Sequence, residues 1–325
     1  MDTLTNVKVP IEHDLLLFNR MFEDSISSNP NPLLTQISSH ILDRRGKMMR
    51  PILIILMARL HGAISESTLY TAVSLELLHT ASLIHDDVVD ESDKRRGQKS
   101  VNAIYDNRIA VLAGDYLLAT SLYYASKTKN NRIIDVVSQL GRDLSDGELL
   151  QLSNINVPTF SEDNYFSVIK KKTAALFSAC AITGSLSVSD DLKFAEFCRQ
   201  IGEYMGICFQ IRDDIFDYFS DKSIGKPTHN DMNEGKLTLP ALYVLNSTKE
   251  SWPREFAVKI KNGDATSEEI ERLSSFVLSS GGIEYAMNKM NDFLNKGLTM
   301  LHSLPDSDIK TSLISYFNYI VSRDI

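Results

Sequence analysis

Cysteine is scarce in this sequence, with three among 325 residues. Cys180, Cys198 and Cys208 are an odd number without the paired spacing of zinc ligands, which argues against a disulfide framework and against a zinc site. We expect them to be buried core residues of a protein from a reducing compartment.

Proline and glycine are also few, at nine and fifteen residues, so long helices can run with little interruption. Helical periodicity recurs along nearly the whole chain, and no run of residues bounded by hairpin signals indicates a strand. Length alone is compatible with one domain or two, but no linker composition and no repeat separates two halves. We predict a single all-α domain over residues 1–325, with residues 1–10 flexible.

The chain lacks an excess of positive charge, and its net charge is -8. A nucleic-acid-binding protein usually presents a broad basic surface, so we predict no nucleic-acid partner. The basic residues gather instead in three local clusters, which suit small phosphorylated ligands, although any one of them alone is typical of a solvated helix face. The clusters are Arg44, Arg45, Lys47 and Arg50; Arg95 and Arg96; and Lys170, Lys171 and Lys172.

A long apolar run is missing too. The most apolar stretch, residues 173–188, contains Ser, Thr and Ala and is shorter than the roughly 20 residues that a membrane-spanning helix needs. Residues 1–12 lack the charged and then apolar plan of a signal peptide. We therefore predict a cytoplasmic protein without a membrane span.

Local signals place several elements. Apolar periodicity predicts helices at about 48–63 and 66–91, and residues 27–32 indicate a loop. Two capping-box patterns, Thr159 with Glu162 and Thr266 with Glu269, predict later helix starts. Residues 220–235 collect Gly, Pro, Asn and Asp between two apolar helices, which predicts a lid loop over a functional site.

An Asp-Asp-x-x-Asp pattern occurs twice, each time within an apolar helix. On a helix, its three carboxylates fall within an arc of about 100°. They would repel one another and be costly to bury unless cations neutralise them, and oxygen ligands of this kind favour Mg²⁺ completed by waters and phosphates. One copy alone is equally typical of a solvated helix face, but two copies beside cationic residues indicate metal sites. The six are Asp86, Asp87, Asp90, Asp213, Asp214 and Asp217.

These motifs, with others in the same order, resemble the trans-prenyltransferases, or polyprenyl synthetases, over residues 15 to 323. The long-chain octaprenyl-type synthases are the most similar group. The motifs are Gly46-Lys47-Met48-Met49-Arg50-Pro51, the run from Leu78 to Asp90, Arg95-Arg96-Gly97, Ala113-Gly114-Asp115-Tyr116, Lys172-Thr173-Ala174, the run from Phe209 to Asp214, Gly225-Lys226-Pro227 and Gly235-Lys236. The sequence departs from the family's usual Gly-Gly-Lys-Arg at residues 45–48, which puts the local loop geometry in doubt.

The resemblance implies a fold and a reaction. It implies an isoprenoid-synthase helical bundle with a central cavity, in which an allylic diphosphate such as farnesyl diphosphate condenses with successive isopentenyl diphosphates. The product is a long all-trans polyprenyl diphosphate, of the kind used as a quinone side chain, and diphosphate is released. It also implies three Mg²⁺ ions per active site, a homodimer, and possible peripheral membrane contact during product release.

The resemblance also assigns roles to residues, and all six motif aspartates become metal ligands. The allylic diphosphate would bind Arg95, Lys172, Gln210, Lys226 and Lys236. Isopentenyl diphosphate would bind Lys47, Arg50, His79 and Arg96 without metal. The catalytic set would be Lys172, Thr173, Gln210, Asp86 and Asp213. Oxygen dipoles of Thr173 and Gln210 suit a carbocation in a dry pocket.

Product length is predicted from the helix that carries the first motif. Ser82 lies one turn before Asp86 on nearly the same face, so a growing prenyl tail would meet it early. Short-chain relatives tend to place a bulky aromatic residue at the position of Ala81. Small residues at 81 and 82 therefore predict a long product, with Leu78 as a candidate for the floor of the tunnel.

Some residues have simpler interpretations. We interpret His85 as a packing residue, and the cluster of Asp143, Asp146 and Glu148 as surface or interface groups without cationic partners. We interpret Arg323 as part of a frayed surface tail, although C-terminal arginines can fold over the site in the family that the sequence resembles. Three alternative functions stay open. These are a short-chain farnesyl or geranylgeranyl diphosphate synthase, a class I terpene cyclase, and an idle subunit of a heteromeric prenyl synthase; the intact second motif weighs against the last two.

Overall fold

The computed structural model describes residues 3–27, 30–43, 46–95, 97–155, 159–219 and 229–323. The contacts divide the chain into two compact units. Unit 1 comprises Met1–Arg142, Leu176–Gly202 and Pro305–Leu313, and unit 2 comprises Asp143–Ala175, Glu203–Leu304 and Ile314–Ile325. Helices α8 (Asn131–Ile155), α11 (Leu192–Phe216) and α17 (Asp308–Ser322) each contribute residues to both units.

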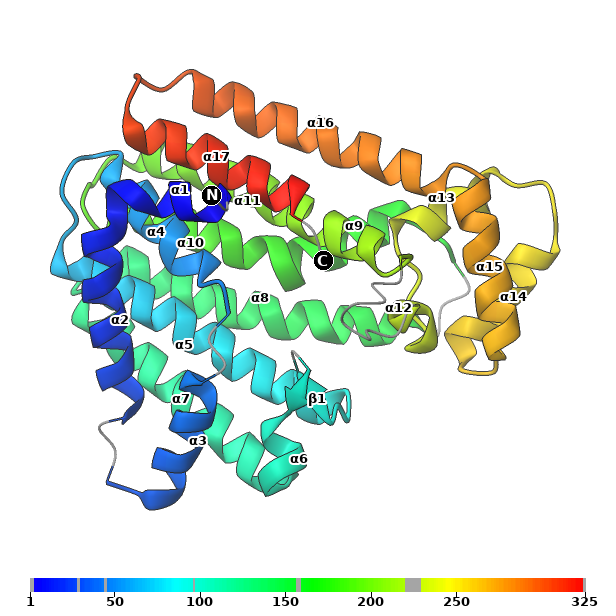
Figure 1. The fold of residues 1–325 in the computed structure, drawn as a ribbon, viewed down its shortest axis with the longest axis horizontal. Helices are drawn as coiled ribbons and strands as arrows, with labels where there is room; N and C mark the ends of the chain where they lie inside the picture. Colours follow the sequence, from blue (N-terminus) through cyan, green and yellow to red (C-terminus); the bar gives the residue numbers. More distant parts are fainter. Residues whose placement is uncertain are drawn as a thin grey trace. The chain divides into compact units, whose positions relative to one another are not determined.

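Unit 1 is built from helices and one short hairpin (Figure 1). Besides its parts of α8, α11 and α17, it contains α1 (Thr3–Lys8), η1 (Val9–Ile11), α2 (Glu12–Ser27), α3 (Pro32–Leu42), α4 (Met49–Arg59), α5 (Glu66–Val89), α6 (Val101–Tyr105), α7 (Asn107–Lys127) and α10 (Ala175–Leu186). Strands β1 (Lys94–Arg95) and β2 (Gln98–Lys99) pair antiparallel. This hairpin corrects the expectation of no strands, since four residues are too short a run for a periodicity signal.

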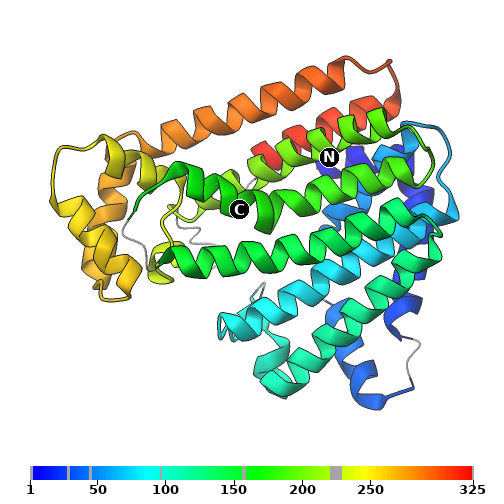
Figure 2. The ribbon, with the colours of Figure 1, turned by 180° about the vertical axis from the view of Figure 1, so that it is seen from behind.

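Helix α5 lies beside α7, as the views in Figures 1 and 2 agree. Gly114 in α7 makes this close approach possible, because a Cβ there would lie 2.2 Å from His85 Nε2. His85 Nε2 in turn lies 3.3 Å from the Val111 carbonyl oxygen. The predicted packing role of His85 is therefore confirmed. Helix α4 is buried on all sides from Met49 to Ala58 except at Arg50, as its lack of an amphipathic pattern requires.

Unit 2 contains α9 (Glu162–Ile169), η2 (Lys170–Ala174), α12 (Asn230–Asn233), α13 (Leu239–Ser247), α14 (Trp252–Asn262), α15 (Ser267–Ser279) and α16 (Gly282–His302), besides its parts of α8, α11 and α17. Helix α15 begins with the predicted capping box of Thr266 and Glu269. Helix α9 does not begin with Thr159 as predicted, because Ser161 caps it by accepting a hydrogen bond from the Asn164 N–H at 3.2 Å. The serine stands immediately before the first helical residue, where a cap must lie.

Other expectations are met in part. The helices predicted at 48–63 and 66–91 correspond to α4 and α5, and the three cysteines are buried without disulfides. The flexibility of residues 1–10 stays a prediction, although Leu4 and Val7 of α1 are buried. Across the part of the chain that the structure describes, no helix combines the length and apolarity required to span a bilayer.

Candidate active site

The first aspartate motif lies at the end of α5, in unit 1, where Asp86 and Asp87 belong to the last turn and Asp90 is the C-cap residue. Its middle member, Asp87, is only 3% exposed and accepts a hydrogen bond from Arg95 Nε at 2.7 Å. Burial raises the pKa of Asp87, and the neighbouring Arg95 opposes that rise. Asn102 Nδ2 donates to the carbonyl oxygens of Asp87 and Ser92, at 3.3 and 3.2 Å, which fixes the backbone where the helix ends.

A cavity of about 100 Å³ in unit 1 is lined by His79, by Glu76 and by Asp87 with Arg95. Gly46 and Met48, on either side of Lys47, also line it. Of the four residues predicted to bind isopentenyl diphosphate, His79 lies in this wall and Lys47 adjoins it in sequence, whereas Arg50 does not line the cavity. The fourth, Arg96, lies outside the described residues.

Met48 has an unusual backbone conformation in the loop before α4. Its φ of 53° and ψ of 41° place it in the left-handed region, which non-glycine residues seldom adopt. The departure from the family pattern at residues 45–48 thus coincides with a strained backbone position directly between Lys47 and α4.

The second aspartate motif lies at the end of α11, in unit 2. Asp213 Oδ1 pairs with the Arg323 guanidinium, and Asp217 accepts the N–H groups of Asn230 and Asp231 at 3.0 and 3.1 Å. Asp217 thereby ties the start of α12 to α11. The second half of the predicted lid is attached to the motif, whereas residues 220–228, including Lys226, lie outside the described residues.

Arg323 corrects the interpretation of a frayed tail. Its side chain is 15% exposed, its guanidinium lies 3.8 Å from the Phe209 ring centroid, and its Nη2 donates to the Phe209 carbonyl oxygen at 3.2 Å. Arg212 Nη2 donates to the Arg323 carbonyl oxygen at 3.1 Å. The end of the chain is held by a planar cation that stacks and bonds at once, which sequence position alone does not predict.

Asp214 is the centre of a buried hydrogen-bond network. Its Oδ2 accepts the Tyr165 hydroxyl at 2.5 Å, and its Oδ1 accepts Gln210 Nε2 at 2.8 Å. The Thr173 hydroxyl donates to Gln210 Oε1 at 2.6 Å. Burial, followed by the nearby Asp231, raises the pKa of Asp214 well above its usual range. Burial and Asp217 raise the pKa of Asp231 to about 7.

The lysine cluster lies in η2, a π-helical turn in which the Ala175 N–H donates to the Lys170 carbonyl oxygen. Lys172 pairs with Glu148 and also approaches Gln151 Oε1 at 3.4 Å, while Lys171 pairs with Asp146. The interpretation of Asp146 and Glu148 as acids without cationic partners was therefore wrong. Gly147 lets α8 approach η2 closely, since a Cβ at this position would lie 2.9 Å from the backbone nitrogen of Lys172.

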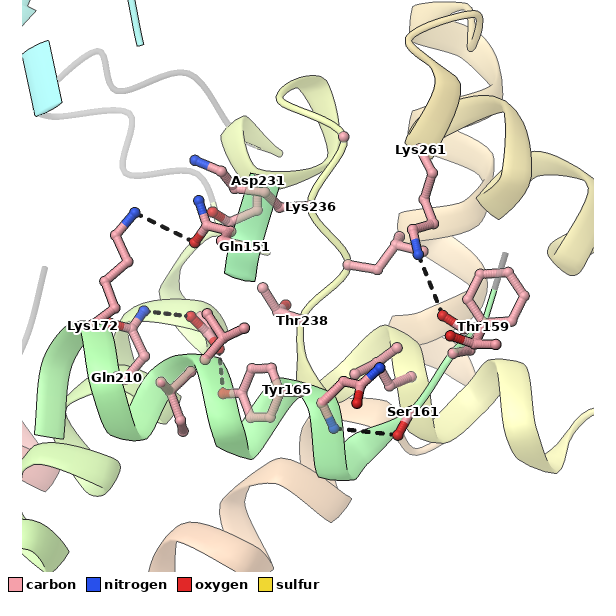
Figure 3. A pocket seen from close by; sticks show the side chains of 18 of the residues that line it. Gln151, Thr159, Ser161, Tyr165, Lys172, Gln210, Asp231, Lys236, Thr238 and Lys261 are labelled. Carbon is pink, nitrogen blue, oxygen red and sulfur yellow. Dashed lines mark hydrogen bonds between the residues drawn. The ribbon is translucent and has the colours of Figure 1, made fainter. Parts of the chain in front are cut away.

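A cavity of about 220 Å³ joins these groups within unit 2 (Figure 3). Lys236 lies on its wall, and the Lys236 Nζ pairs with Glu234 at 2.5 Å. The structure thus brings together most of the residues predicted for the allylic diphosphate in this unit. Its lining includes Lys172, Thr173, Gln210, Asp214, Asp231, Lys236, Thr238 and Lys261.

Known proteins match this chain along most of its length. The family model of polyprenyl synthetase matches residues 31–277. The chain belongs to the polyprenyl synthetase family. It is 32% identical over 293 residues to "Octaprenyl diphosphate synthase" of Escherichia coli K12, with 90% of each chain covered.

Solved structures of the family share the fold. The "geranylgeranyl pyrophosphate synthase" of Bacteroides thetaiotaomicron is 51% identical, with a TM-score of 0.88 and 99% and 100% of the two chains covered. The "decaprenyl diphosphate synthase" of Rhodobacter capsulatus is 31% identical, with a TM-score of 0.91 and 98% and 99% covered. The predicted all-helical isoprenoid-synthase fold and prenyltransferase class are confirmed.

Within this family framework, the middle aspartate of each motif differs from its neighbours. Asp87 and Asp214 are 3% and 2% exposed and bonded to protein donors. Asp86 and Asp90, like Asp213 and Asp217, are one helical turn apart and share a face. Among the described residues no group of three or more His, Cys, Asp or Glu side chains is arranged to hold a metal by itself. Ligands from substrate phosphate are the usual completion of a Mg²⁺ site.

The residues predicted to set product length belong to α5. Leu78 and Ala81 are buried, and the Ser82 hydroxyl donates to the His79 carbonyl oxygen at 2.9 Å. None of the three lines the 100 Å³ cavity, which follows the face of His79 and Leu83 instead. Their role in product length stays a prediction.

Sequence reasoning missed Tyr165 and Asp231, and it missed the pairing of Glu148 with Lys172. Tyr165 stands in an apolar stretch of α9 and reads as an ordinary core aromatic residue. Asp231 falls in a loop rich in polar residues, where one more carboxylate carries no signal. Glu148 had a usable signal, because an acid on a long helix and a triple-lysine cluster invite a search for pairing.

Proposed function

We propose that this chain is a polyprenyl diphosphate synthase that joins an allylic diphosphate to successive isopentenyl diphosphates and releases diphosphate at each step. The observation that carries the proposal is the cavity of unit 2, where three lysines and the Thr173–Gln210 pair line the same wall as a buried member of the second aspartate motif. Octaprenyl and decaprenyl synthases among its relatives support a long-chain product.

The donor set fits Mg²⁺. Asp86, Asp90, Asp213 and Asp217 offer hard carboxylate oxygens, and Asp213 already holds a cation, the Arg323 guanidinium. We propose that these four aspartates hold the ions, three per active site. For Asp87 and Asp214, which the resemblance also assigns as ligands, we propose a supporting role, because they accept hydrogen bonds from Arg95 and from Tyr165 and Gln210. When bound, Mg²⁺ stabilises the negative charge that develops on the departing diphosphate.

The protein's own groups then divide the work. Lys172, Lys236 and Arg95 bind oxygens of the allylic diphosphate, and we assign Lys226 to the same group. Lys172 is paired with Glu148 in this structure, so the diphosphate must compete with that carboxylate for it. Isopentenyl diphosphate is bound by Lys47, Arg50, His79 and Arg96.

The carbocation is the next requirement. Once the carbon–oxygen bond ionises, the oxygens of Thr173 and Gln210 present weak dipoles to the cation without attacking it. The released diphosphate removes the proton after the new carbon–carbon bond has formed. No separate protein base is then needed.

A shorter product is the second candidate, because a structure 51% identical to this chain is named a geranylgeranyl pyrophosphate synthase. The deciding experiment is to incubate the purified chain with Mg²⁺, isopentenyl diphosphate and primers of several lengths and to size the products. Products of about eight isoprene units support the first candidate, and termination at four supports the second. Absence of any condensation overturns both.

We also propose a homodimer. Helix α7 exposes apolar side chains that a monomer would leave in water, with Leu112 at 67% and Tyr123 at 55% exposure, beside Val111 and Leu122. Light scattering at micromolar concentration should give twice the chain mass, and Leu112→Glu should reduce it toward the single-chain value. A single-chain mass for the unmodified protein would contradict this.

A further inference from the structure

A phenol that no assigned role uses is built into the candidate active site. Tyr165, in α9, is 9% exposed, and its hydroxyl donates to Asp214 Oδ2 at 2.5 Å (Figure 3). Asp214 is itself 2% exposed, and both residues line the 220 Å³ cavity of unit 2. A hydrogen bond to a buried carboxylate is among the stronger ones in proteins.

The bond continues as a chain of fixed polarity. Gln210 Nε2 donates to Asp214 Oδ1 at 2.8 Å, so the amide directs its nitrogen to Asp214 and leaves its oxygen for another partner. The Gln210 carbonyl oxygen is then the acceptor for the Thr173 hydroxyl, at 2.6 Å. Because this bond uses the only proton on Thr173 Oγ1, the lone pairs of that oxygen are what remains for another partner.

These hydrogen bonds join the α9–η2 segment to α11 at two points, through Tyr165 with Asp214 and through Thr173 with Gln210. Tyr165 and Thr173 lie on α9 and η2, eight residues apart, while Asp214 and Gln210 lie one turn apart on α11. The two hydrogen bonds, Tyr165–Asp214 and Thr173–Gln210, together fix the rotation of η2 relative to α11. Lys172, directly before Thr173, is carried by the same π-helical turn.

We infer that Tyr165 is a positioning residue: it fixes the rotamer of Asp214, and through it the amide of Gln210, so that Thr173 and Gln210 present oxygen to the reacting carbon. The inference rests on the proposed function and assigns Tyr165 no contact with substrate. Partners of this kind behind a reactive group typically change activity by about 10- to 100-fold when removed.

The chain offers a matched control. The Tyr285 hydroxyl, on α16, donates to Glu162 Oε2 at 2.9 Å and so anchors the same helix α9 at its first residue. Tyr285→Phe deletes one hydroxyl and one anchor of α9, as Tyr165→Phe does, but leaves Asp214 untouched. Any effect that Tyr165→Phe shows and Tyr285→Phe does not must therefore pass through Asp214.

The experiment compares steady-state prenyl transfer by the wild-type chain, Y165F and Y285F, with melting curves of each. We expect kcat of Y165F to fall by about 10- to 100-fold. The KM for isopentenyl diphosphate should stay within about twofold, because its proposed contacts, Lys47, Arg50 and His79, belong to unit 1. Y285F should keep the wild-type kcat.

A double-mutant cycle with Gln210→Met gives a readout that a packing role would not move. Since the effect runs through Gln210, Y165F should cost little more once Gln210 is gone, so the two losses should not multiply. Independent losses in the cycle, equal losses in Y165F and Y285F, or unfolding of Y165F alone would each overturn the inference. An inactive wild-type chain would instead overturn the proposed function, and this role with it.

Discussion

Arg323 gives a sharp prediction, because it occupies the carboxylate that the proposed metal site needs. Its guanidinium pairs with Asp213 and stacks 3.8 Å from the Phe209 ring centroid. A metal ion that binds Asp213 must displace this cation or share the carboxylate with it. Removing the guanidinium with Arg323→Met should therefore strengthen binding of Mg²⁺ when no diphosphate is present.

The magnitude follows from the two contacts. The ion pair, with Asp213 44% exposed, is worth about 1 kcal/mol or less, and a stacked cation over an aromatic ring is worth about 0.5–1 kcal/mol. The variant should then lose about 1–2 kcal/mol of stability. With an unfolding entropy of about 2.1 cal/mol/K per residue, this lowers Tm by about 1.5–3 °C. Release of a pair worth about 1 kcal/mol raises the affinity for Mg²⁺ about fivefold.

Calorimetric titration with Mg²⁺ and thermal melting measure both effects on the same samples. Arg323→Lys should be intermediate, because it keeps the charge and loses the planar fork. Lys259→Met is the control for deletion of a cation, since Lys259 pairs with Glu269 between α14 and α15. A lower Tm with unchanged or weaker Mg²⁺ binding in the methionine variant would refute the competition and leave Arg323 as a structural clamp.

Three further predictions concern metal, pH and product length. Asp86→Ala or Asp213→Ala should reduce turnover by about 10²–10³ or more with unchanged circular dichroism, and full wild-type activity in EDTA would contradict the metal mechanism. The folded-state pKa of Asp231 is raised to about 7, so between about pH 4 and 7 the folded chain binds more protons than the unfolded chain. Stability should therefore fall as pH rises through that window. The Tm of Asp231→Asn should depend less on pH than the wild-type Tm, and parallel curves of Tm against pH would refute this. Ala81→Phe should shorten the product to a few isoprene units while condensation continues, and an unchanged product spectrum would place the tunnel elsewhere.

The sequence could predict the parts of this protein that repeat or alternate. The two aspartate motifs, the helices α4 and α5, and the cap at Thr266 follow from spacing, periodicity and hydrogen-bonding chemistry within a few residues. Tertiary contacts account for most of what it missed. Nothing local distinguishes Tyr165 from a core aromatic residue, and the pairing of Arg323 with Asp213 spans 110 residues. The misplaced cap of α9 was a local error, since Thr159 and Ser161 both offer a hydroxyl near the helix start.

The π-helical turn at residues 170–174 constrains the number of residues between α9 and α10. A π turn holds one residue more than an α turn, so it changes the angular phase between α9 before it and α10 after it by about 100°. Tyr165 and Ile169 therefore obey one helical wheel, and Leu176 and Phe177 obey another. A single-residue deletion here would restore an uninterrupted α-helix and preserve every hydrophobic residue, yet it would turn one of the two buried faces away from its partners. Tolerance to insertion and deletion should accordingly be low at this point of the chain, within a segment that looks by composition like any other helix.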